Sequence, residues 1–239
     1  MSVLSDQILS TFRHEVARYD TPENRINYQR FFKEPLDNPV GLKTTALRKV
    51  FSVCYKKFGH HPGRDIFDAC DQLLASNERY IHSLVFEWTS KISDDFRAGD
   101  IGRFEFWLKN YVNNWGSCDS LCGPLGLLVL KFPQSVSRTI KWTKSKNRWF
   151  RRASAVSLIQ ALRKGLLLDE AFKIAELLLL DTDDMVQKGY GWMLKEASNA
   201  FPEAVIDFVG ARKALMPRTA LRYAIEKLPA TKRKELMKK

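Results

Sequence analysis

The chain has 239 residues and a formal net charge of +12, with 39 Lys and Arg against 27 Asp and Glu. Its length and its 45% hydrophobic content suffice for one large domain or two small ones with a proper core. A basic excess of this size argues against an ordinary metabolic enzyme. It favours a polyanionic partner, nucleic acid before an anionic membrane.

The cysteines and the apolar stretches bear on the compartment. Four cysteines at irregular spacings are too few for a disulfide framework. The first twenty residues are amphipathic and lack the apolar core of a signal peptide. The stretches "LGLLVL" and "IAELLLL" fall short of the roughly 20 residues that a membrane-spanning helix needs. We therefore expect a reduced, cytoplasmic protein without membrane-spanning segments.

Helical periodicity runs through nearly all of the sequence, and β-type alternation is hard to find. This predicts an all-α protein. The first helix is expected over residues 3–19, before the turn "TPEN". The second contains "NRINYQRFFK" and ends at the breaker-rich "EPLDNPVG", and the third contains "KTTALRKVFSVCYKKFG".

The later helices follow as pairs separated by short polar or Gly/Pro loops. A spacing of about 35–45 residues is typical of HEAT or armadillo repeats. It predicts a curved α-solenoid of antiparallel helix pairs whose concave face binds DNA. We find no linker, and expect a single domain over residues 1–239 with a frayed basic tail at 230–239. The expected pairs are 64–76 with 78–93, 101–112 with 113–132, 136–145 with 147–165, 168–181 with 184–201, and 202–215 with 217–228.

The basic charge is concentrated in residues 135–152, "SVSRTIKWTKSKNRWFRR", which contain no acid. Cations can meet phosphates while the interleaved aromatic rings meet sugars or bases. For any single residue of this run, a solvated cation or a core tryptophan is the more common role. For the run as a whole, the absence of acids favours DNA or RNA.

Three separate segments hold residues suited to chemistry at a sugar. In "NWGSCD", Trp115 and Asp119 are four residues apart and share a helix face. "WFRRAS" places Arg152 near a helix start, and "QKGYGWMLKEA" places Trp192 behind two glycines. Each glycine in a helix costs about 1 kcal/mol relative to alanine, so we expect another backbone or a ligand to approach closely there.

In this order, these segments resemble the bacterial HEAT-like-repeat alkylpurine-DNA glycosylases of the AlkD type. Trp115 and Asp119 match the family's Trp-x-x-x-Asp, Arg152 its catalytic-site arginine, and Trp192 its second cleft tryptophan. "NYQRFFK" followed by "VGLKTTALRKV" is similar to the family's N-terminal block, with Tyr28 at a position that faces the DNA cleft in relatives. The likeness runs from about residue 24 to about residue 228. No single motif is specific, but the ordered set is.

The resemblance implies a base-excision-repair hydrolase that cuts the N-glycosidic bond of cationic N3- or N7-alkylated purines, such as 3-methyladenine and 7-methylguanine, in duplex DNA. Asp119 would stabilise the oxocarbenium-like sugar and position water. Trp115 and Trp192 would cradle the sugar, and Arg152 would hold the carboxylate ionised and bind a phosphate. It further implies a protein that uses no cofactor and no membrane and is associated with the nucleoid when bound to DNA. The sequence leaves the oligomeric state open, although a solenoid of this size that clasps DNA is usually sufficient as a monomer.

Two positions depart from the family pattern. Relatives often carry a tryptophan where this chain has Asn114 and an acid where it has Gly116, which affects lesion range and rate. Some family members bind unusual DNA without excising bases, so the alternative is a non-catalytic HEAT-repeat protein for damaged or branched DNA. A protein-binding scaffold is a third reading. The candidate DNA-binding residues are Tyr28, Lys43, Arg48, Lys144, Lys146, Arg148, Arg151 and Lys188.

Each site residue also has an ordinary structural explanation. Asp119 could cap a helix start, Arg152 could pair with a packing acid, and the tryptophans could be core residues. Cys118 and Cys122 could share a metal, but no further ligands are evident nearby. We expect both to be small buried hydrophobes, and we assign no metal site.

Overall fold

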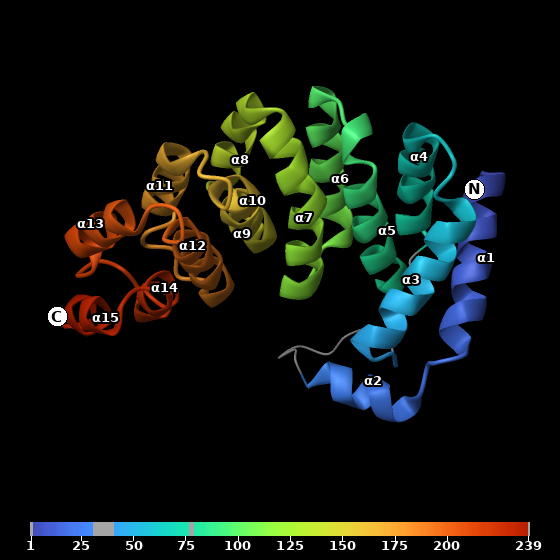
Figure 1. The fold of residues 1–239 in the computed structure, drawn as a ribbon, viewed down its shortest axis with the longest axis horizontal. Helices are drawn as coiled ribbons and strands as arrows, with labels where there is room; N and C mark the ends of the chain where they lie inside the picture. Colours follow the sequence, from blue (N-terminus) through green and yellow to red (C-terminus); the bar gives the residue numbers. More distant parts are fainter. Residues whose placement is uncertain (1, 31–40, 77–78, 239) are drawn as a thin grey trace. The chain divides into compact units, whose positions relative to one another are not determined.

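The computed structural model describes residues 2–30, 41–76 and 79–238, and all regular structure in these ranges is helical (Figure 1). The all-α prediction is confirmed. Contacts divide the chain into two compact units, Met1–Phe96 and Arg97–Lys239, which are described separately. The single domain and the concave curvature stay predictions. None of the described helices is both long and apolar enough to cross a membrane.

The first unit packs α1 against α3 and α4, and α4 against α5. Its core includes the stacked rings of Phe12 and Phe51, with centroids 6.1 Å apart, and the fully buried Trp88. The second predicted helix ends earlier than expected, at Gln29, and its last residues lie outside the described ranges. The helices are α1 (Val3–Ala17), α2 (Pro22–Gln29), α3 (Thr44–Phe58), α4 (Gly63–Leu74), α5 (Arg79–Lys91) and the 3-10 turn η1 (Ser93–Asp95).

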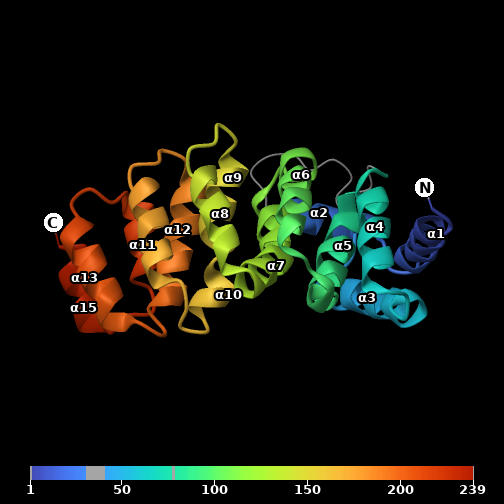
Figure 2. The ribbon, with the colours of Figure 1, turned by 90° about the horizontal axis from the view of Figure 1, so that it is seen from above.

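The second unit alternates its helices between two layers. Packing runs from α7 to α9, from α9 to α12 and from α12 to α14, while α6, α8, α11 and α13 cover them (Figure 1). Figure 2 shows the same helices stacked in chain order. The bounds are η2 (Ala98–Asp100), α6 (Ile101–Tyr111), α7 (Trp115–Lys131), η3 (Pro133–Ser135), α8 (Val136–Trp142), α9 (Arg148–Val156), α10 (Ile159–Leu162), α11 (Leu168–Leu177), α12 (Asp184–Ala197), α13 (Pro202–Arg212), α14 (Arg218–Ala224) and α15 (Ala230–Met237).

Ion pairs join equivalent positions of successive repeats in this unit. The pairs Asp119 with Arg152 and Arg163 with Glu196 each span 33 residues. The early part of α7 thus meets the middle of α9, and the end of α10 meets the end of α12. Other hydrogen bonds between successive repeats of this unit span 35 to 37 residues.

Two predicted elements differ from the structure. The helix expected over 147–165 is divided, because the N–H of Leu158 donates to the Ala155 carbonyl three residues back and tightens the turn between α9 and α10. The tail, expected to fray, forms α15. Its Leu236 is buried and approaches Gly210 of α13. Lys213 and Arg218 also donate to carbonyls of this helix, at Glu235 and Met237.

Candidate active site

Asp119 and Arg152 form a two-point ion pair in the second unit. The Arg152 Nε donates to Asp119 Oδ1 and its Nη2 donates to Oδ2, both at 2.8 Å. The side chain of Arg152 is 7% exposed and that of Asp119 is 19% exposed. Parallel bonds of this kind fix the plane of the carboxylate as well as its position. Of the predicted residues, these two are brought into direct contact.

The guanidinium of Arg152 remains a cation despite its burial. Burial lowers the pKa of Arg152, but the hydrogen bonds and the charge of Asp119 outweigh it, so the pKa lies above the ordinary arginine value. A buried cation needs a fixed anion beside it. The Asp119 carboxylate occupies that place, and its side chain is still partly exposed to solvent.

The start of α7 explains both Asp119 and one departure from the family pattern. The helix is capped by Asn114, whose Oδ1 accepts from the N–H of Ser117 at 2.9 Å. The alternative in which Asp119 caps this helix is therefore wrong. Asparagine before Trp115 has a local role, because it satisfies an amide that the helix start leaves unpaired.

Helix α12 packs directly over Arg152. The Arg152 Nη1 donates to the carbonyl of Met185 at 2.5 Å, and a Cβ on Gly189 would lie 3.1 Å from the Arg152 Cγ. A Cβ on Gly191 would lie 2.8 Å from the carbonyl oxygen of Ala220 in α14. The close approach of another backbone is confirmed at Gly191, whereas at Gly189 the group that approaches is a side chain. Gly189 makes room for the Arg152 side chain and Gly191 for a neighbouring backbone.

The two predicted tryptophans lie on α7, which carries Asp119, and on α12, which contacts Arg152. Trp115 is the first residue of α7, one turn before Asp119, and it is 37% exposed. Trp192 is partly buried in α12 and follows Gly189 by three residues, which places it on the same side of the helix. Its indole N–H donates to Oε1 of Glu196 at 3.2 Å. Neither tryptophan is a fully buried core residue, unlike Trp88.

Helix α7, which carries Asp119, also carries two buried cysteines. Cys118 and Cys122 are buried free thiols, as predicted, and the Cys118 Sγ donates to the carbonyl of Trp149 at 3.6 Å. Burial raises the pKa of the Cys122 thiol well above its usual value. Within residues 2–30, 41–76 and 79–238, no three His, Cys, Asp or Glu side chains are arranged to hold a metal ion.

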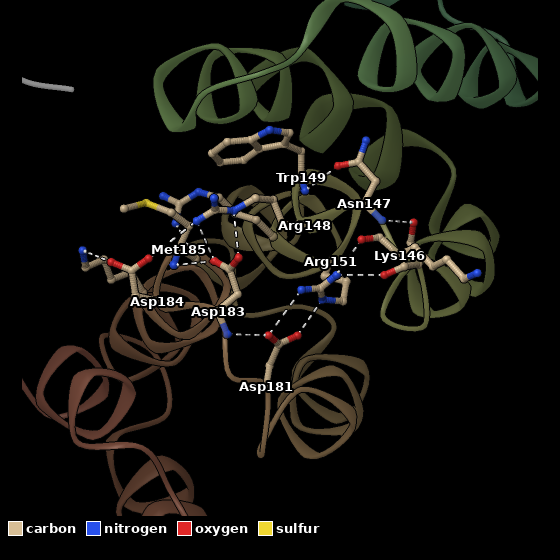
Figure 3. Close-up of polar contacts among 12 residues, drawn as sticks. Lys146, Asn147, Arg148, Trp149, Arg151, Asp181, Asp183, Asp184 and Met185 are labelled. Atoms are coloured by element: carbon tan, nitrogen blue, oxygen red, sulfur yellow. Dashed lines mark hydrogen bonds and ion pairs between the residues drawn. The ribbon is translucent and has the colours of Figure 1, made fainter. Parts of the chain in front are cut away.

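Two arginines of the basic run are paired with aspartates from the loop before α12 (Figure 3). The Nη2 of Arg148 donates to Asp183 Oδ1 at 2.9 Å, and the Nε of Arg151 donates to Asp181 Oδ2 at 2.6 Å. The Nη1 of Arg151 also donates to the carbonyl of Ser145. These contacts join the start of α9 to the start of α12. Residues 135–152 contain no acid themselves, but in the folded chain aspartates from another segment lie beside two of their arginines.

Other predicted cations are more open. Lys144 and Lys146 are exposed, and their side chains make no ion pair with the part of the chain that the structure describes. The Lys146 side chain extends away from the aspartate cluster (Figure 3). Lys188 instead pairs with Asp184, Nζ to Oδ2 at 3.1 Å.

The remaining DNA-binding candidates belong to the first unit. Lys43 precedes α3 and Arg48 lies within it, and both are exposed. Tyr28 is in α2, and its side chain lies outside what the structure describes. Their assignment to DNA stays a prediction.

Sequence reasoning missed several residues around the pair. Asn114 had a detectable signal, since asparagine before a helical stretch is a common cap. The ion pairs of Asp181 and Asp183 could not be recognised from the sequence, because their partners lie 30 and 35 residues away. Glu196 was visible as the residue four positions after Trp192, but its other partners come from distant segments.

Comparisons with known proteins agree with this fold. Residues 12–228 match the family described as "DNA alkylation repair enzyme". A structure described as a predicted DNA alkylation repair enzyme from Enterococcus faecalis is 15% identical, with a TM-score of 0.74, and the match covers 89% of this chain and 98% of that one. AlkD2 from Streptococcus mutans is 16% identical, with a TM-score of 0.58, and the match covers 92% and 100%. No curated protein gives a significant sequence match. With most of its length matched and its helical-repeat fold shared, the chain belongs to the DNA alkylation repair enzyme family.

Proposed function

We propose that this protein is a DNA glycosylase that hydrolyses the N-glycosidic bond of cationic N3- and N7-alkylated purines in duplex DNA. One observation carries the proposal, namely a carboxylate held in a fixed plane by a buried guanidinium while 19% of its side chain stays exposed to solvent. Family membership supports DNA as the partner.

The chemistry suits a fixed carboxylate. An alkylated purine already carries a formal positive charge, so it leaves as a neutral base with the electron pair of its bond to C1′. The sugar then develops positive charge, which Asp119 stabilises. A water molecule attacks C1′ and gives its proton to the carboxylate, which releases it to solvent. Because Arg152 binds both oxygens, the carboxylate needs little reorganisation during the reaction.

The two tryptophans complete the proposed site. A positively charged sugar is attracted to the face of an aromatic ring. Trp115 on α7 and Trp192 on α12 belong to the same two helices that carry Asp119 and contact Arg152. We assign them to the walls on either side of the reacting sugar.

DNA binding is assigned first to the open lysines. Arg148 and Arg151 form ion pairs with aspartates. Lys144 and Lys146, in contrast, are exposed to solvent. Lys146→Glu is expected to weaken duplex binding and to reduce the salt slope of the affinity by about one phosphate contact. Fluorescence anisotropy at several salt concentrations measures both.

The matched control for this prediction is Lys173→Glu, which makes the same charge change at an exposed position of α11. It should leave the salt slope unchanged. Equal weakening by Lys146→Glu and Lys173→Glu would mean that only net charge matters, and would contradict the assignment of Lys146 to a phosphate.

Base release tests the proposed function directly. The purified protein is incubated with a duplex that carries a single 7-methylguanine, and free base is measured against spontaneous loss and against an unmodified duplex. We expect release from the modified duplex alone. Tight binding without release would overturn the glycosylase proposal and favour the non-catalytic alternative.

A further inference from the structure

Trp192 is anchored by a buried carboxylate that the sequence analysis did not assign. The indole N–H of Trp192 donates to Oε1 of Glu196, one turn later on α12, at 3.2 Å. The same Oε1 accepts from Lys227 Nζ at 3.2 Å, and Oε2 accepts from Arg163 Nε at 2.8 Å. The side chain of Glu196 is only 7% exposed.

This carboxylate is ionised. Burial raises the pKa of Glu196, but the hydrogen bonds and charges of Arg163 and Lys227 outweigh it, and the net pKa lies below the ordinary glutamate value. The indole N–H therefore donates to an anion. Such a bond is stronger than one to a neutral acceptor, and it holds the ring against rotation.

The anchor is built from three successive repeats. Arg163 follows α10, Glu196 lies on α12, and Lys227 follows α14. The side chains of Arg163 and Lys227 are 54% and 42% exposed, whereas that of Glu196 is 7% exposed, so solvent contacts mainly the two cations. The orientation of Trp192 thus depends on the packing of α12 between its neighbours as well as on α12 itself.

We propose that Glu196 is a positioning residue that fixes the plane of the Trp192 indole against the reacting sugar, an inference that rests on the proposed function. The negative charge of Glu196 also acts on the ring itself. Because the indole N–H donates to an anion, electron density moves from the N–H bond into the ring, and the faces of the ring become more negative. Both effects favour a sugar that becomes positively charged in the transition state.

A double-mutant cycle measures this coupling. Glu196→Gln keeps the size and one acceptor oxygen but removes the charge, and we expect it to lower the single-turnover rate of base release about tenfold with little change in duplex affinity. Trp192→Phe keeps a ring but removes the N–H. In the Trp192→Phe background, Glu196→Gln should change the rate less than about twofold.

The matched control is Glu226→Gln. Glu226 pairs with Lys195 across neighbouring repeats, as Glu196 does with Lys227, but the indole N–H of Trp192 donates to Glu196 and not to Glu226. It should leave the rate of base release unchanged. Equal losses with Glu196→Gln in both backgrounds, or an equal loss with Glu226→Gln, would overturn the positioning role.

The contact between Glu196 and Trp192 can also be tested by NMR spectroscopy, without a measurement of base release. The indole N–H resonance of Trp192 is identified by its absence in Trp192→Phe. In Glu196→Gln it should shift upfield and exchange faster with water. A resonance unchanged by Glu196→Gln would overturn the anchor. A wild-type protein that releases no base would contradict the proposed function, while the NMR measurement would still decide whether Glu196 holds Trp192.

Discussion

Asp119→Asn is expected to lower the rate of base release by at least about a hundredfold, while duplex affinity stays the same or rises. The substitution removes the negative charge that faces the developing sugar cation but keeps the size of the side chain. Affinity does not fall, because one anion less lies near the DNA phosphates. Single-turnover release from a 7-methylguanine duplex, with anisotropy for binding, checks both parts.

The same substitution has a structural cost that must be separated from catalysis. Arg152 is buried, and an amide leaves its charge without a counterion, so we expect a loss of about 2–3 kcal/mol in the free energy of unfolding. Thermal unfolding gives the temperature below which the variant remains folded. The release assay is run below that temperature.

Asp181→Asn is the matched control. It removes the anion from the neighbouring Arg151 pair, which joins the starts of α9 and α12 and is similarly buried. Its stability should fall by a comparable amount while base release stays within a few-fold of wild type. Equal loss of release in Asp119→Asn and Asp181→Asn would mean that Asp119 acts through folding alone.

The helices were predictable because their signal is local. Apolar residues at helical spacing place α1, α3 and α7 almost where the structure has them, since each window contains its own evidence. Asp119 and Arg152 were found by residue type and order, which a family resemblance supplies. Their two-point contact could not be read from spacing, because it joins helices 33 residues apart.

What the sequence obscured is charge pairing in space. Residues 135–152 contain no acid, yet Glu105 pairs with Arg138 and accepts from the Trp142 indole, while Asp181 and Asp183 pair with two more arginines. A window along the chain counts only neighbours in sequence, whereas a helical repeat brings each residue beside the equivalent one in the next repeat. Fewer cations of residues 135–152 are therefore available to bind phosphates than the composition of this segment indicates.

The substitution Arg152→Lys tests what the two-point contact of the guanidinium with Asp119 contributes. Arg152→Lys keeps the positive charge but offers a single ammonium, which cannot bind both Asp119 oxygens in one plane and also reach the Met185 carbonyl. We expect base release to fall about 10- to 100-fold, because the Asp119 carboxylate still has a cation beside it but is no longer fixed in one plane. The free energy of unfolding should fall by about 2–4 kcal/mol.

Arg151→Lys is the matched substitution one residue earlier. It weakens the pair with Asp181 and the contact with the Ser145 carbonyl, so stability should fall while base release is largely kept. A second test places Arg152→Lys in the Asp119→Asn background, where it should slow release only slightly further, because the carboxylate that the guanidinium orients is gone. If the two losses instead add in full, Arg152 acts on the substrate directly rather than through Asp119, and the fixed carboxylate is not the centre of the mechanism.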